Sequence, residues 1–197
     1  MESSKQLCGI ILSGGKSSRF GSDKGSFMFN GKPMIEYALE LLKPFCNNII
    51  ISSNMPDLYE KYAYEIVEDS IKDIGPLGGI YSCLKKSKIE HNIILSCDTP
   101  FINHGLMGYL ADSIQEGDKA IVPYHGDGFL EPLCSYYNTS LISSIEKAIS
   151  DGNYKLMSFL NGIAARKLVI DDSMEFYTPN IFDNLNSLSD VTKHIRN

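Results

Sequence analysis

The chain has 197 residues, of which 43% are hydrophobic and 21% charged, the balance of a globular protein long enough to bury a full core. Its formal net charge of −6 and its pI near 5.2 argue against a large nucleic-acid interface, which needs clustered lysine and arginine. The polar start and the short apolar run 7–12 do not suit a signal peptide or membrane span, so we expect a cytoplasmic protein.

In the first half of the chain, short apolar runs alternate with amphipathic stretches. We predict strands at 7–13, 48–53, 65–67 and 92–97, and helices at 33–42, 77–86 and 106–115. Strands buried on both faces read as continuous apolar runs, and alternating βα units require parallel pairing. The pattern therefore predicts an α/β fold, a three-layer doubly wound (Rossmann-like) mostly parallel sheet.

The second half is less regular. We predict strands at 120–123 and 133–137 around a glycine-rich turn at 126–128, helices at 141–149 and 154–160, and late strands at 167–170 and 181–185. No internal repeat or linker interrupts the sequence. We therefore expect a single domain over 1–197, with a nucleotide-binding half up to about residue 105 and an acceptor-binding half from about residue 106.

The cysteines and histidines do not form a metal-site pattern. No two of the five cysteines make a C-x-x-C pair, and four of them lie in apolar stretches, which favours reduced, buried thiols over zinc or disulfides. The four histidines lack ligand spacing, and we interpret each as a surface or loop residue.

The strongest signal is the loop after the first predicted strand, L-S-G-G-K-S-S-R-F-G-S-D-K at 12–24. Its three glycines let the backbone turn tightly, and exposed N–H groups at such a turn form an anion cradle. Lys16, Arg19 and Lys24 add three cations at the carboxyl end of a strand, where open α/β sheets bind ligands. The loop therefore predicts phosphate binding. Its spacing fits neither a P-loop nor the G-x-G-x-x-G of dinucleotide sites.

Two further loops contain candidate site residues. Gly75-Pro76-Leu77-Gly78-Gly79 begins a predicted helix shortly after Asp69; its glycines let a base or ribose lie against the backbone, although a plain turn would use the same residues. Asp98 ends the fourth strand, in S-C-D-T-P-F. Mg²⁺ prefers one or two carboxylates together with substrate phosphates, so we favour Asp98 as a metal ligand over a helix N-cap.

These loops resemble those of one family. The run 12–24 is similar to the signature L-x-G-G-x-S-x-R-x-G-x-D-K of small nucleotidyltransferases. Among these enzymes it most resembles the molybdenum cofactor guanylyltransferases, which commonly have Met at the position of Phe20. The segments G-P-L-x-G at 75–79, C-D-x-P-F at 97–101 and E-P-L at 131–133 also resemble that family. The ending F-x-N-x-N at 182–186 matches, but the three residues that follow it depart from the family's Thr, Pro and Glu.

The resemblance implies a fold of the nucleotide-diphospho-sugar transferase type and the transfer of GMP from GTP to the phosphate of molybdopterin. It implies that Arg19, Lys24 and Asp98 are catalytic, with Asp98 holding Mg²⁺ as the cofactor. The nucleotide-binding residues that it implies are Leu12, Ser13, Gly14, Gly15, Lys24, Asn54, Asp69, Gly75, Pro76, Leu77, Gly78 and Asp98. The acceptor-binding residues are Glu131, Pro132, Asn184 and Asn186.

The expected partners are therefore GTP and molybdopterin, together with transient contacts to proteins that supply or accept the cofactor. We expect no nucleic acid and no membrane. Three alternatives stay open at this stage: a cytidylyltransferase that uses CTP on the same cofactor, a nucleotidyltransferase for another small phosphate, and a non-catalytic GTP-binding scaffold. The sister CTP enzymes usually have a G-x-x-G-H-P-type segment, which this sequence lacks.

Overall fold

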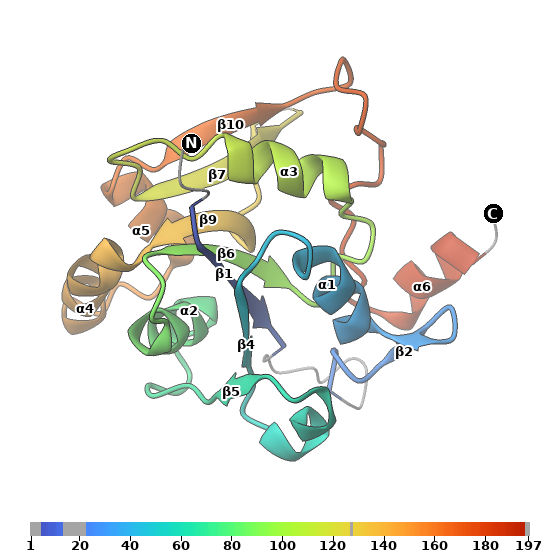
Figure 1. Ribbon diagram of the computed structural model, residues 1–197, viewed down its shortest axis with the longest axis horizontal. Helices are drawn as coiled ribbons and strands as arrows, with labels where there is room; N and C mark the ends of the chain where they lie inside the picture. Colours follow the sequence, from blue (N-terminus) through green and yellow to red (C-terminus); the bar gives the residue numbers. More distant parts are fainter. Residues whose placement is uncertain (1–4, 14–22, 127, 196–197) are drawn as a thin grey trace.

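The structure is a computed structural model, which describes residues 5–13, 23–126 and 128–195. Its centre is an eight-stranded sheet in the order β10-β7-β9-β6-β1-β4-β5, with the short β8 paired to β7 (Figure 1). The strands are β1 (Leu7–Leu12), β4 (Asn48–Ser52), β5 (Glu65–Val67), β6 (His91–Ser96), β7 (Ala120–His125), β8 (Phe129–Leu130), β9 (Cys134–Asn138) and β10 (Arg166–Ile170). A two-stranded hairpin joins β2 (Met28–Phe29) to β3 (Lys32–Pro33).

The helices lie on both faces of this sheet. They are α1 (Met34–Leu42), α2 (Pro76–Lys86), α3 (His104–Asp112), α4 (Ile142–Ser150), α5 (Leu156–Gly162) and α6 (Leu188–Ile195), with 3-10 turns η1 (Pro56–Leu58), η2 (Glu60–Tyr62) and η3 (Thr139–Leu141). Within the described residues, no helix is both long and apolar enough to cross a membrane.

The sheet is mostly parallel, as the alternating pattern predicted. β1 pairs in parallel with β4 and β6, β4 with β5, and β7 with β10. β9 lies antiparallel between β6 and β7. Because β6 and β7 both run against β9, they run in the same direction, and their carboxyl ends reach the same edge as those of β1, β4 and β5. This carboxyl edge is where an open α/β sheet binds its ligands.

Two apolar cores fill the spaces between sheet and helices. Side chains of α1 and α3 pack on one face, for example Ile35, Leu39 and Leu106. Side chains of α2, α4 and α5 pack on the other, for example Ile80 and Ile145. All six residues of β1 are buried, because this central strand is covered on both sides. The three-layer α/β architecture predicted from the sequence is confirmed.

Two local predictions are wrong. The run 181–185 is not a strand: residues 181 and 182 end a turn, and residues 183–185 are irregular. Ile181, Phe182 and Leu185 are nevertheless buried. The apolar residues of this run are therefore explained by burial of a connecting segment and not by pairing in the sheet. Pro33 is not the first helical residue but the N-cap of α1, in extended conformation with φ −57° and ψ 139°.

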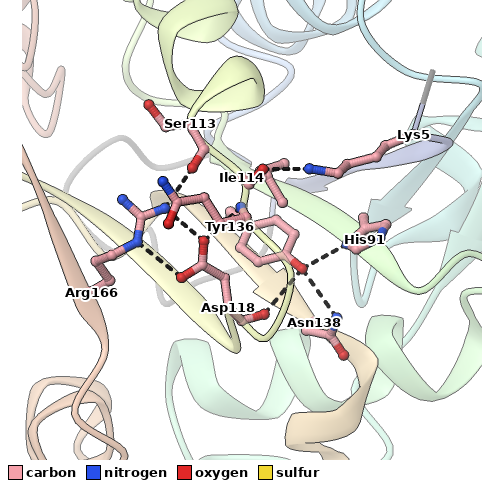
Figure 2. Close-up of polar contacts among 9 residues, drawn as sticks. Lys5, His91, Ser113, Ile114, Asp118, Tyr136, Asn138 and Arg166 are labelled. Atoms are coloured by element: carbon pink, nitrogen blue, oxygen red, sulfur yellow. Dashed lines mark hydrogen bonds and ion pairs between the residues drawn. The ribbon is translucent and has the colours of Figure 1, made fainter. Parts of the chain in front are cut away.

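A polar cluster ties together the opposite edge of the sheet, where β6 begins and β9 ends (Figure 2). Arg166 binds the Asp118 carboxylate through two nitrogens, at 2.9 and 2.6 Å. The Tyr136 hydroxyl lies 2.7 Å from His91 Nδ1 and accepts from Asn138 Nδ2 at 3.1 Å. Hydrogen bonds of this kind fix the positions of β6, β9 and β10 relative to one another. The cluster lies at the far edge from the predicted site loops.

Candidate active site

The loops at the carboxyl edge enclose a cavity of about 590 Å³, a usual size for a small-molecule site. Its lining comes from the ends of β1, β4, β5 and β6 and from the start of α2. The lining residues are Leu12, Asp23, Ser52, Ser53, Asn54, Met55, Asp69, Lys72, Asp73, Gly75, Pro76, Gly79, Ser96 and Leu133. Five of them, Leu12, Asn54, Asp69, Gly75 and Pro76, were predicted from the sequence.

One wall of the cavity is built by a reciprocal pair of side chains. Asn54 Nδ2 donates to Asp69 Oδ2 at 3.0 Å, and the Asp69 backbone N–H donates to Asn54 Oδ1 at 3.0 Å. The pair joins the loop after β4 to the loop after β5. Because both amide and carboxylate are fixed, this wall presents hydrogen-bonding groups whose positions are set before a ligand binds.

The start of α2 forms the adjoining wall. Gly75 is its N-cap and has φ +68° and ψ −159°, a conformation that is essentially restricted to glycine. Pro76 follows at the first helical position. A Cβ on Gly79 would lie 2.8 Å from Ser52 Oγ and 3.3 Å from Asp69 Oδ1. The glycines therefore let the helix approach the strand ends, which brings the backbone against the cavity.

Asp98 lies beyond Ser96, just past the carboxyl end of β6, and is only 8% exposed. Ser96 Oγ donates to its Oδ1 at 2.5 Å, and Lys24 Nζ donates to its Oδ2 at 2.8 Å. Lys24 also donates to Asn186 Oδ1 at 2.5 Å. A buried carboxylate, a lysine and an amide from three distant parts of the chain thus meet next to the cavity.

The C-terminal segment is anchored at this point. The Leu185 backbone N–H donates to the carbonyl oxygen of Asp98 at 2.8 Å, and Leu185 is fully buried. Asn186 therefore contacts the predicted centre. Asn184 does not: its side chain is exposed, and its Nδ2 is 3.5 Å from the carbonyl oxygen of Phe182. Of the two asparagines, Asn186 thus binds Lys24, whereas Asn184 points elsewhere.

A buried tyrosine holds the described part of the first loop. Tyr59, which is 1% exposed, bonds through its hydroxyl to Ser13 at 2.5 Å and also to Asp23. Burial and the hydrogen bond to Asp23 raise the pKa of Tyr59, so it stays a neutral donor. The hydroxyl thereby connects the residue after β1 to the residue before Lys24. Nothing in the spacing of the motif pointed to Tyr59, which lies far away in the sequence.

The second half of the chain contributes another carboxylate at the same edge. Glu131 precedes β9 and accepts a hydrogen bond from His125 Nε2 at 2.8 Å. Burial, opposed by His125, raises the pKa of Glu131. Leu133 reaches the cavity lining, and its carbonyl oxygen accepts from the Ser96 backbone N–H at 2.8 Å. The E-P-L segment therefore lies next to β6, the strand that Asp98 follows.

The other predicted residues fall into four groups. Ser13, Lys24 and Asp98 adjoin the cavity without lining it, whereas Leu77 and Gly78 are buried in α2. Glu131 and Pro132 precede β9 at the same edge of the sheet. Gly14, Gly15 and Arg19 lie outside the described residues. The sequence missed Ser52, Lys72 and Asp73 as lining residues. The available signal was the end of the predicted strand for Ser52, and the position just before the α2 glycines for Lys72 and Asp73.

The site suits Mg²⁺ by the chemistry of its donors. Among the described residues, no three His, Cys, Asp or Glu side chains gather as a metal-binding cluster. Mg²⁺ does not need such a cluster, because one or two carboxylates together with substrate phosphates suffice. Asp98 supplies one buried carboxylate, and Lys24 beside it is a cation suited to the same phosphates.

An open, mostly parallel sheet with a cavity, a carboxylate and a lysine at its carboxyl edge is an arrangement suited to binding a nucleotide, as a nucleotidyltransferase requires. The comparisons with known proteins give the family. The model for the MobA-like NTP transferase domain matches residues 9–168, and the chain belongs to this family.

The names of similar proteins are consistent with this family. A protein of Flavobacterium johnsoniae named a probable molybdenum cofactor guanylyltransferase is 35% identical over 93% of this chain and 96% of that protein. A molybdenum cofactor guanylyltransferase of Syntrophotalea carbinolica is 32% identical over 93% and 88%. The crystal structure of molybdopterin-guanine dinucleotide biosynthesis protein A from Archaeoglobus fulgidus superposes with a TM-score of 0.80 at 26% identity, covering 94% of this chain and 95% of that one.

Proposed function

We propose that the chain transfers GMP from GTP to the phosphate of molybdopterin and releases pyrophosphate. The observation that carries the proposal is the meeting of Lys24, Asp98 and Asn186 beside the cavity. The names of the relatives support the choice of donor and acceptor.

In the proposed reaction, an oxygen of the acceptor phosphate attacks the α-phosphorus of GTP. The new P–O bond forms as the bond from the α-phosphorus to the bridging oxygen breaks, and pyrophosphate leaves with that electron pair. A phosphate is already ionised at neutral pH, so no general base is required. The work of the protein is positioning and neutralising charge, as in other phosphoryl transfers.

Four side chains of the site have a role in the proposed reaction. The Lys24 ammonium compensates the charge of the phosphates, and Asn186 orients that ammonium by accepting one of its hydrogens. Asp98 would hold Mg²⁺, which, when bound, neutralises charge on the phosphate oxygens. Ser96 fixes the Asp98 carboxylate by donating to Oδ1.

The cavity walls support guanine as the base. Guanine presents an N1–H and a 2-amino group as donors, and the Asp69 carboxylate in the cavity lining is an acceptor for them. Adenine lacks the 2-amino donor and has an acceptor at N1, so it would leave such groups unsatisfied. Each unpaired buried group costs about 1–3 kcal/mol, and two would favour GTP over ATP by roughly a hundredfold. Cytosine is smaller and would leave part of a purine site empty.

We also propose that the protein works in the cytoplasm. Five free cysteines, four of them buried, suit a reducing cytoplasm. Burial raises the pKa of the Cys83 and Cys97 thiols to about 12, which keeps them protonated and unreactive. Contacts with proteins that deliver or collect the cofactor also belong to the proposal.

A competition assay tests the function. The protein is incubated with Mg²⁺, molybdopterin and all four NTPs, and the dinucleotide is identified by mass spectrometry together with the pyrophosphate released. We expect the guanine dinucleotide almost exclusively, and only when Mg²⁺ is present. A preference for CTP would identify the sister cytidylyltransferase. GTP binding without pyrophosphate release would identify a binding protein.

A further inference from the structure

Three rings stack where β7 ends. His125 lies against Phe182 with ring centroids 4.4 Å apart and an interplanar angle of 21°. On the hairpin that β7 makes with β8, Phe129 stacks with the same imidazole at 6.0 Å and 30°. The stack runs from a buried ring to an exposed one, since Phe182 is 8% and Phe129 63% exposed. The sequence-based interpretation of His125 as a surface or loop residue is wrong, because it ends β7 and is half-buried.

The stack is held in place from several sides. His125 Nε2 lies 2.8 Å from Glu131 Oε1, and the Glu131 backbone N–H donates to the carbonyl oxygen of Pro123 at 3.0 Å. Phe182 belongs to the segment that continues to Leu185, whose N–H is bonded to Asp98. The ring stack and the predicted metal ligand are therefore fixed to one another through short connections.

The strand order places this stack on the acceptor side of the reacting centre. The donor cavity lies over β1, β4 and β5, and Asp98 follows β6 in the middle of the sheet. β7 lies two strands beyond β6 in the opposite direction, which is roughly 10 Å at the usual strand spacing. A ring bound here would thus lie opposite the nucleotide, within reach of Asp98 for a phosphate on a short side chain.

The exposed ring has little to contribute to the fold. Phe129 belongs to a strand of two residues at a hairpin, and most of its surface faces solvent, so its burial stabilises the protein only slightly. An exposed aromatic ring supported from behind by a fixed imidazole is instead a platform for a flat ligand. Stacking on such a ring tolerates many heteroaromatic systems, because each offers a π-face.

We propose that Phe129, supported by His125 and Phe182, is the platform on which the pterin ring of the acceptor stacks. This inference rests on the proposed function and names the part of the site that binds the acceptor's ring system. Phe129 binds the pterin, and His125 is a positioning residue that holds Phe129 and is itself oriented by Glu131. The phosphate of the same molecule then extends toward Lys24 and Asp98.

Three substitutions at one position test the platform. Phe129→Ala removes the ring, Phe129→Leu keeps apolar bulk without a π-face, and Phe129→Tyr keeps the ring. Molybdopterin alone is titrated into each protein without GTP, and binding is followed by quenching of its fluorescence; GTP affinity and thermal stability are measured in parallel. Removing one stacked base typically weakens binding by about tenfold or more.

We expect Phe129→Ala and Phe129→Leu to weaken molybdopterin binding about tenfold, Phe129→Tyr to match wild type, and all three to bind GTP normally. In turnover assays the loss should appear in KM for molybdopterin and not in kcat. Equal molybdopterin affinity of the alanine variant and wild type, or no binding by wild type, would overturn the inference. If wild type binds molybdopterin through Phe129 but forms no dinucleotide, only the proposed function fails.

Discussion

Replacing Asp98 by asparagine separates its role in turnover from its role in the fold. The substitution keeps the shape of the side chain and removes the negative charge. Ser96 can turn its hydroxyl toward the new amide, but the Lys24 ammonium loses its ion pair at 2.8 Å. The Lys24 side chain keeps 23% exposure, so water replaces part of that contact, and we expect a loss in unfolding free energy of about 1 kcal/mol.

The effect on turnover should be far larger. Removing one group that stabilises charge in a transition state typically lowers kcat by about 10²–10³-fold, and the variant would also lose its carboxylate ligand for Mg²⁺. Pyrophosphate release is measured across a Mg²⁺ titration, and stability by urea denaturation. We expect at least about a hundredfold lower kcat with a protein that still folds.

The matched control is Asp118→Asn at the opposite edge of the sheet (Figure 2). It is the same chemical change, and it breaks the paired contacts to Arg166 at 2.9 and 2.6 Å. We expect it to cost about 1–3 kcal/mol of stability and to leave turnover unchanged. If Asp98→Asn matches wild type at low Mg²⁺, or if both variants lose turnover equally, Asp98 is not the metal ligand.

Three further outcomes are expected. Lys24→Ala should weaken GTP binding by about 1.5–3 kcal/mol, because a cation facing the phosphates is lost; calorimetry with unchanged affinity would contradict this. The hydrogen bond from Arg166 lowers the pKa of Asp118 in the folded protein, so this pair stabilises the fold at pH values above the unfolded-state pKa of about 3.9. In denaturation experiments, the stability difference between wild type and Asp118→Asn should therefore shrink as the pH falls below about 4. Gly75→Ala meets no atom within 4 Å but must adopt φ +68°, so it should cost about 1–3 kcal/mol and weaken GTP binding, whereas Gly162→Ala, which also has open space, should cost nothing.

The sequence predicted the positions of several residues around the cavity because these positions depend on local sequence patterns. A buried strand followed by a short loop fixes which residues reach the carboxyl edge, and this logic placed Asn54, Asp69 and Asp98 correctly at strand ends. Hydrophobic periodicity and parallel pairing are properties of consecutive residues, so the architecture could be predicted as well.

What the sequence could not predict depends on contacts between distant segments. Asn186 meets Lys24 across 162 positions, and Tyr59 meets Asp23 across 36. The run 181–185 looked like a strand because burial of a connecting segment produces the same apolar pattern as sheet pairing. The partner of His125 could not be predicted either, since Glu131 reaches it only after the β7–β8 hairpin turns back.

The direction of β9 determines which of its flanking residues lie at the carboxyl edge of the sheet, where we propose that both substrates bind. A parallel strand at that position would enter the sheet from the far edge, and its preceding loop would lie beside Asp118. Because β9 is antiparallel, its preceding residues Glu131 and Leu133 lie instead at the carboxyl edge, between the end of β6 and the end of β7. The reversal therefore places Glu131 and Leu133 on the same side of the sheet as Asp98. The loops after β1, β4 and β5 remain on the parallel side, so in the proposed reaction GTP and its acceptor approach Asp98 from opposite directions.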